Sequence, residues 1–84
     1  MSTQPSLQQL ARVLGAKIRQ LRKKKGWTQS EFADACRIHR SHMGKIERGE
    51  ANVRLSTLVV IAEILEVKVE KLLTGAEEPR TMWT

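Results

Sequence analysis

Eighty-four residues with a single cysteine form one small domain, because the chain is too short for a second hydrophobic core and Cys36 has no partner for an internal disulfide. The longest uninterrupted apolar run, residues 58–62, is far shorter than the roughly 18 residues of a membrane span, and no signal-peptide pattern follows Met1, so we expect a cytoplasmic protein. The net charge of +6 is unevenly distributed: residues 1–54 carry twelve Lys or Arg against four Asp or Glu, or +8, and residues 55–84 carry −2. Such an excess of cations is typical of a protein that approaches a polyanion, and also of a solvated lysine-rich helix end.

The first predicted helix begins near Leu7 and ends in a cationic turn, residues 22–25. Cations suit the negative end of a helix dipole, and Gly26 follows where a left-handed cap is needed. The apolar residues of this segment are spaced by threes and fours, which places them on one helix face: Leu7, Leu10, Ala11, Leu14, Ile18 and Leu21. We expect residues 1–6 to form a flexible N-terminus.

Two short helices are predicted next. Thr28 stands three residues before Glu31, a capping-box pattern that opens a second helix ending near Ala35. After a tight turn, a third helix over about residues 40–48 ends at Gly49. Its apolar spacing has a new phase: Ile38, Met43 and Ile46. Two such helices with a small residue, Ala33, at their crossing form a helix-turn-helix, although a generic helix pair would show the same periodicity.

The rest of the chain predicts two further helices and a tail. A loop over residues 50–53 leads to a fourth helix with apolar residues at helical spacing: Leu55, Leu58, Val59, Ala62 and Leu65. A fifth helix over about residues 69–73 ends at Thr74 and Gly75. We therefore predict an all-α, compact five-helix domain over residues 7–75, followed by a C-terminal tail over residues 76–84.

Four sequence blocks in register carry the functional signal. They are residues 18–22, 27–33, 43–49 and 58–65, the last followed by Val67 and the pair Leu72 and Leu73. In this order and spacing they resemble the phage-repressor type of helix-turn-helix, the Cro/XRE superfamily of transcriptional regulators, over about two thirds of the chain. The resemblance implies a repressor-like DNA-binding domain with its helix-turn-helix at the second and third helices.

The resemblance also implies which residues contact DNA. It places base-reading side chains on the outward face of the third helix: Arg40, Ser41 and Lys45. Arg and Lys suit the O6 and N7 acceptors of guanine, whereas Gly44, at a further reading position, brings no side chain. It implies phosphate contacts at three more positions: Gln29, His39 and Asn52. His42 lies beside this face, and its role stays open.

Two charged residues match the paired charges by which this family links its first helix to the end of its third. These are Arg22 and Glu47, and the alternative is two independent surface charges. Arg37 departs from the family pattern, which has glycine there, so the turn is either strained or differently shaped, and Arg37 could add a phosphate contact. Arg54 stands where a capping hydroxyl is usual, so the cap falls to Asn52 or is missing.

Neither a metal site nor catalysis is expected. Cys36, His39 and His42 occur at three-residue steps, but on one helix they would spread over more than half its circumference, and no fourth ligand is near. Both histidines belong to the DNA-facing helix, and no glycine-rich phosphate loop or acid pair is present in the sequence. We therefore expect no cofactor and no enzymatic activity.

We expect a sequence-specific regulator of double-stranded DNA, a repressor that binds a palindromic operator as a homodimer, because one recognition helix reads too few base pairs. The alternatives are an antitoxin that neutralises a partner toxin and a restriction-modification control protein. The expected dimer interface is the fifth helix and the tail, with five apolar residues: Val69, Leu72, Leu73, Met82 and Trp83. Val69 and Leu72 could equally be core, and Trp83 could belong to a disordered terminus.

Overall fold

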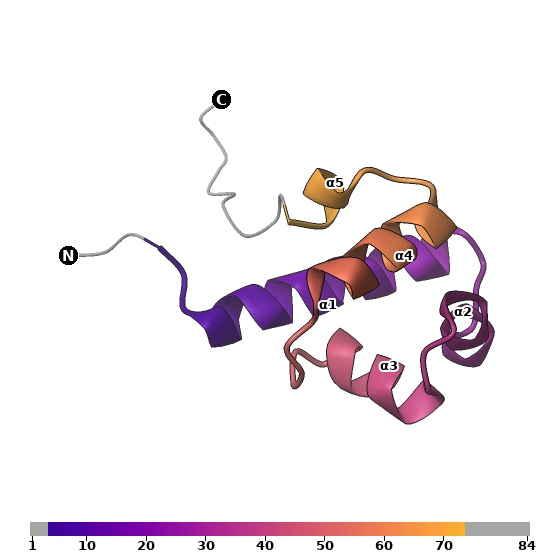
Figure 1. Cartoon of the computed structure of the whole chain (residues 1–84), viewed down its shortest axis with the longest axis horizontal. Coiled ribbons are helices and arrows are strands. Elements are labelled where there is room, and N and C mark those ends of the chain that lie inside the picture. Colours follow the sequence, from indigo (N-terminus) through magenta and orange to yellow (C-terminus); the bar gives the residue numbers. More distant parts are fainter. Residues whose placement is uncertain (1–3, 74–84) are drawn as a thin grey trace.

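The structure, a computed structural model, describes residues 4–73, which form five helices (Figure 1). These are α1 (Leu7–Lys24), α2 (Gln29–Cys36), α3 (Arg40–Glu47), α4 (Leu55–Leu65) and α5 (Val69–Leu73). No strand occurs in this part of the chain, so the predicted all-α class and the order of the elements are confirmed. The tail over residues 76–84, with Met82 and Trp83, lies outside the described residues.

The long helix α1 begins at a cap that the sequence analysis missed. The Ser6 side chain accepts a hydrogen bond from the Gln9 amide at 3.1 Å, and the Gln9 side chain accepts one from the Ser6 amide at 2.8 Å. This capping box satisfies two amide groups that a helix start otherwise leaves unpaired. Ser6, which we expected in a flexible terminus, therefore fixes the start of α1, and the Ser-x-x-Gln pattern was the signal for it.

Helix α1 lies at the centre of the domain and contacts α3, α4 and α5, while α2 packs on α3 and α4. The fully buried side chains come from all five helices: Ile18, Phe32, Met43, Ile46, Ile61, Leu65 and Leu72. Cys36 is also buried, and burial raises the pKa of its thiol to about 11, so the thiol stays protonated at neutral pH. Leu72 is thus a core residue rather than an interface residue.

The buried face of α4 is shifted around the helix from the face that its apolar spacing predicts, and it includes Ile61, which was not predicted. It is formed by four residues: Leu58, Ile61, Ala62 and Leu65. Leu58 and Leu65 lie at the middle of this stripe, whereas Leu55 and Val59 lie to one side of it and are 75% and 45% exposed. Leu7, at the far start of α1, is 66% exposed as well.

Within residues 4–73, no helix has the length and hydropathy needed to cross a membrane.

Candidate nucleic-acid interface

The turn between α2 and α3 has the shape that glycine usually provides. Arg37 has φ 59° and ψ 40°, in the left-handed region that is uncommon for residues other than glycine. Its amide donates to the Asp34 carbonyl at 3.1 Å, and the next amide, of Ile38, donates to the Ala33 carbonyl at 2.9 Å. Of the two alternatives left open by the sequence, the turn is therefore strained rather than differently shaped.

Helix α3 is held by a close approach to the backbone of α1. Gly15 lies against the end of α3, and a Cβ atom there would be 2.3 Å from the Ile46 carbonyl oxygen and 2.7 Å from that of Glu47. Both distances are shorter than any real Cβ contact, so only glycine allows the two helices to meet this closely. Backbone atoms of both helices therefore fix the position of α3 against α1.

A buried ion pair adds a directional link between the same helices. Arg22 Nε donates to Glu47 Oε2 at 2.7 Å, and Arg22 Nη2 donates to Glu47 Oε1 at 3.0 Å, with the two side chains 7% and 3% exposed. Arg22 Nη1 also donates to the Trp27 carbonyl at 2.9 Å. Because desolvation offsets much of the attraction in a buried pair, its main consequence is the orientation of α3 rather than added stability.

Glu47 has a third donor that the sequence did not indicate. The Gln29 side-chain amide donates to Glu47 Oε1 at 3.1 Å, so the side chain expected to contact a phosphate is already engaged within the protein. The capping box of Thr28 and Glu31 satisfies the amides of those two residues, and these hydrogen bonds hold the pKa of Glu31 below its ordinary value. The amides of Gln29 and Ser30 are left at the positive end of α2, where an anion is favoured.

The outward face of α3 carries the residues expected to read bases. Arg40, Ser41 and Lys45 are exposed. They line one concavity of about 680 Å³ together with Gln29 and His39, and the remaining lining residues are Asp34, Ile38, Gly44 and Arg48. The structure therefore brings five of the six residues expected to contact DNA to one surface.

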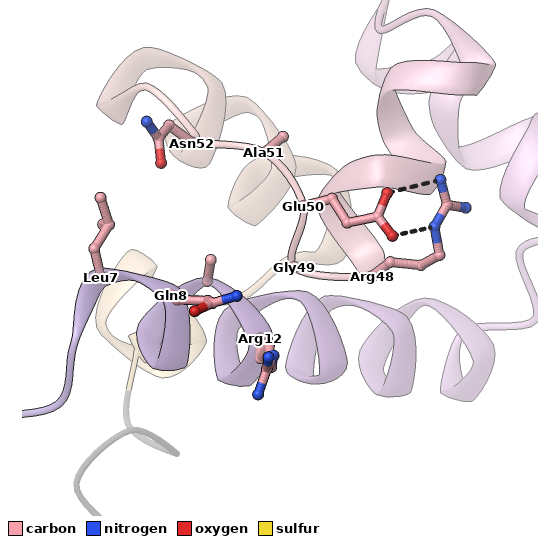
Figure 2. A pocket seen from close by; sticks show the side chains of 9 residues that line it. Leu7, Gln8, Arg12, Arg48, Gly49, Glu50, Ala51 and Asn52 are labelled. Carbon is pink, nitrogen blue, oxygen red and sulfur yellow. Dashed lines mark hydrogen bonds and ion pairs between the residues drawn. The ribbon is translucent and has the colours of Figure 1, made fainter.

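Asn52, the sixth residue, lies on a neighbouring surface. The loop that follows α3 runs alongside the start of α1, and Figure 2 shows Asn52 on this loop, above Leu7 and Gln8. Arg48 lines this second concavity as well as the first, so it stands between the two surfaces. Of the two alternatives for the start of α4, the cap is missing: Arg54 is the N-cap residue and makes no side-chain capping hydrogen bond.

His39 and Ser41 form a linked pair at the start of α3. The His39 ring is the N-cap, with Nδ1 accepting from the Ser41 amide at 3.2 Å and lying 2.9 Å from the Ser41 hydroxyl. Because Nδ1 accepts this amide proton, a neutral ring carries its own proton on Nε2 and has a donor to offer an anion. His39 thus fixes Ser41 as well as occupying the position expected to face a phosphate.

These features define a helix-turn-helix, and comparison with known proteins agrees. The helix-turn-helix family HTH_3 matches residues 18–72. The control protein C.SmaI of Serratia marcescens is 39% identical over 62 residues, which is 74% of each chain. The chain therefore belongs to the HTH_3 helix-turn-helix family, a family of transcriptional regulators.

Two solved structures are similar over most of the described chain. The restriction-modification controller protein C.AhdI from Aeromonas hydrophila has a TM-score of 0.72 and 32% identity, covering 74% of this chain and 94% of that one. SinR, the master regulator for biofilm formation, in complex with DNA, has a TM-score of 0.69 and 34% identity, covering 71% of this chain and 97% of that one.

Proposed function

We propose that this chain is a sequence-specific regulator of transcription that binds double-stranded DNA through α3. The observation that carries the proposal concerns the two faces of α3. Its outer face is exposed and carries two cations, and its inner face is held against α1 at Gly15 and by the ion pair of Arg22 and Glu47. A rigidly held helix with outward Arg and Lys side chains suits the major groove, which admits an α-helix. In this proposal the chain acts by binding and not by catalysis, and it works in the cytoplasm.

The residues have distinct roles in this proposal. Base edges are read by Arg40, Ser41 and Lys45, while phosphates are contacted by Gln29, His39 and Asn52. Since the Gln29 side chain is engaged by Glu47, its phosphate contact comes from the amide at the start of α2. The pair of Arg22 and Glu47 fixes the angle at which α3 enters the groove.

We further propose a repressor that acts as a homodimer on a palindromic operator, with residues 7–75 as the DNA-binding domain and residues 76–84 as a dimerising tail. Of the apolar residues expected at the interface, Leu72 is buried in the core and Val69 packs against the core partly buried, whereas Leu73 is 39% exposed. Leu73 is therefore a better candidate for the dimer interface than Val69 or Leu72. Met82 and Trp83 lie outside the described residues.

Salt titration tests the DNA contact. If each protomer neutralises about three to five phosphates, the binding of a dimer to duplex DNA has a log-log salt slope of roughly −5 to −9. The measurement is the dissociation constant by fluorescence anisotropy at several salt concentrations. A slope near zero would remove the proposal.

Two variants separate base reading from general attraction. Arg40→Ala and Lys45→Ala should each lose about 1 to 3 kcal/mol on the preferred duplex and flatten the preference at one base position. The matched control is Lys68→Ala, which removes an exposed cation from the connection between α4 and α5 and should leave base preference intact. If neither α3 variant changes the binding of a selected duplex, α3 is not the reading helix.

Selection from a random pool of duplexes tests the assembly. A homodimer should return an inverted repeat with half-sites about 10 base pairs apart, because symmetric recognition helices on one face of B-DNA are separated by one turn, roughly 34 Å. Sedimentation of the chain with and without residues 79–84 measures the contribution of the tail. A monomer that selects a single unrepeated half-site would contradict the homodimer.

A more specific version of this function, a restriction-modification control protein, is supported by similarity to C.SmaI and C.AhdI, with 94% of the C.AhdI chain covered. A restriction gene beside this one, with a selected operator upstream of it, would support that version. An antitoxin role stays a prediction, and co-purification of a second polypeptide with the full chain tests it.

A further inference from the structure

Arg48 and Glu50 form an ion pair beside the reading face that has no role in the proposed contacts so far. Arg48 Nε donates to Glu50 Oε2 at 3.1 Å and Nη2 donates to Glu50 Oε1 at 3.2 Å, as Figure 2 shows. The side chains are 58% and 54% exposed, so the pair is of the kind that stabilises a fold little. Another anion can therefore easily replace Glu50 as the partner of Arg48.

The absence of a side chain at Gly44 leaves room for the Arg48 guanidinium beside this part of α3. A Cβ atom on Gly44 would lie 3.2 Å from Arg48 Nη1 and 3.6 Å from Gln29 Oε1. The guanidinium thus covers the one reading position of α3 that has no side chain of its own. Within residues 4–73, Nη1 makes no hydrogen bond, so its two N–H groups remain as donors next to the residues that line the first concavity.

The register of α3 places Arg48 on the same stripe as its base-reading residues. Arg40, Gly44 and Arg48 follow one another at intervals of four, so Arg48 continues the outward face two turns further along, about 12 Å from Arg40 along the axis. In a helix-turn-helix the N-terminal residues of the recognition helix contact base edges. A guanidinium at the opposite end of that helix is placed for the sugar-phosphate backbone instead.

We propose that Arg48 is a further DNA-binding residue that contacts a phosphate, and that Glu50 holds its guanidinium in place and competes with that phosphate when DNA is absent. The inference rests on the proposed function, because it needs α3 to lie on DNA. Two oxygens of a phosphate replace the two carboxylate oxygens of Glu50 in the same bidentate geometry. Glu50 thereby limits how strongly the cationic face binds any DNA.

Two substitutions test the two halves of the inference on a duplex obtained by selection and on poly(dI-dC). Arg48→Gln should weaken both by about three- to tenfold and reduce the log-log salt slope by about 0.9 per protomer, the value for one lost phosphate. Glu50→Gln should tighten both by about two- to fivefold. The matched controls are Lys68→Gln and Glu70→Gln, which make the same charge changes around α5, on the opposite side of α1 and α4 from α3 in Figure 1.

The double variant separates competition for Arg48 from plain repulsion of DNA by the Glu50 charge. If Glu50 acts through Arg48, then Glu50→Gln tightens binding only when Arg48 is present. Equal tightening in the Arg48→Gln background would overturn the competition between Glu50 and the phosphate. Loss of affinity for the selected duplex alone would assign Arg48 to a base edge and overturn the phosphate contact, and unchanged binding of both probes would overturn the inference alone. Failure of the unmodified chain to bind any duplex would overturn the proposed function with it.

Discussion

The turns after α1 and α3 and the turns after α2 and α4 all contain a residue in the left-handed backbone conformation, but they use different residue types for it. The first two use glycine, with φ 84° at Gly26 and φ 76° at Gly49. The other two place Arg37 and Glu66 in the left-handed conformation, with φ 59° and 60°. All four helix ends are therefore left-handed, and only half of them have the residue that adopts this conformation without strain.

The surroundings explain why glycine is needed at one of these turns and only preferred at the others. A Cβ atom on Gly49 would lie 2.7 Å from Arg12 Cα and 2.9 Å from the Arg12 amide nitrogen, so the turn after α3 packs directly on the backbone of α1. Among residues 4–73, nothing lies within 4 Å of a Cβ atom built on Gly26. Arg37 and Glu66 are exposed. Lack of space enforces glycine at Gly49, whereas elsewhere only the torsional strain of about 1 to 2 kcal/mol applies.

The largest effect is expected from Gly49→Ala. It combines left-handed strain with a clash against backbone that cannot move aside, so the free energy of unfolding should fall by about 2 to 5 kcal/mol. Urea denaturation followed by circular dichroism measures it. A loss no greater than that of Gly26→Ala would show that the turn relaxes away from Arg12.

Gly26→Ala should have an intermediate effect. The added methyl group meets open space, so only the strain of the left-handed backbone remains, about 1 to 2 kcal/mol of lost stability. Urea midpoints of this variant and of Gly49→Ala, measured side by side, give the contribution of the contact with Arg12 as a difference. A neutral Gly26→Ala would contradict the left-handed conformation after α1.

Arg37→Gly should act in the opposite direction. It removes the strain of a Cβ atom at positive φ, at the expense of a more flexible unfolded chain, and should raise the free energy of unfolding by about 0.5 to 1 kcal/mol. Arg37→Ala, which keeps the Cβ atom, is the control and should show no such gain. Glu66→Gly should gain less, because it also removes the ion pair with Lys25.

The smallest effect is a pH dependence at one of these two turns. The hydrogen bond from Lys25 holds the pKa of Glu66 below its ordinary value of 4.5. A carboxyl whose pKa is lowered by folding contributes stability above its ordinary pKa and loses it as the pH falls through the lowered value. The melting temperature of the unmodified chain should therefore approach that of Glu66→Gln in acid, whereas Arg37→Gln should keep a constant difference over the same range.

The parts of the fold that could be predicted from the sequence depend on local signals. The box of Thr28 and Glu31, the glycine after α1 and the spacing of apolar residues act within a few residues of one another, so they identified the helices and most of their ends. Glu66 gave no such signal, because glutamate is not a turn residue; it takes the left-handed conformation where the chain turns from α4 into α5, two helices that contact each other. The exposure of Leu55 and Val59 depends equally on which side of α4 meets the core.

The features of the candidate DNA interface also fall into those that could be predicted from the sequence and those that could not. The outward positions of α3 follow from helical register, and the resemblance to repressors implied the pairing of Arg22 with Glu47, which is present in the structure. The hydrogen bond from Gln29 to Glu47 and the placement of Arg48 over Gly44 join residues that meet only in three dimensions. No local pattern reports such contacts, so they were not predicted.

The close approach at Gly15 has a consequence for how binding preference could change. Helix α3 is set against α1 by backbone atoms and by buried groups, while the side chains of Arg40 and Lys45 make no hydrogen bond within residues 4–73. Exchanging these two side chains leaves the frame that carries them untouched. The packing that positions α3 is therefore independent of the side chains that face DNA. A new operator preference could be engineered by substituting outward side chains of α3, without redesigning the core.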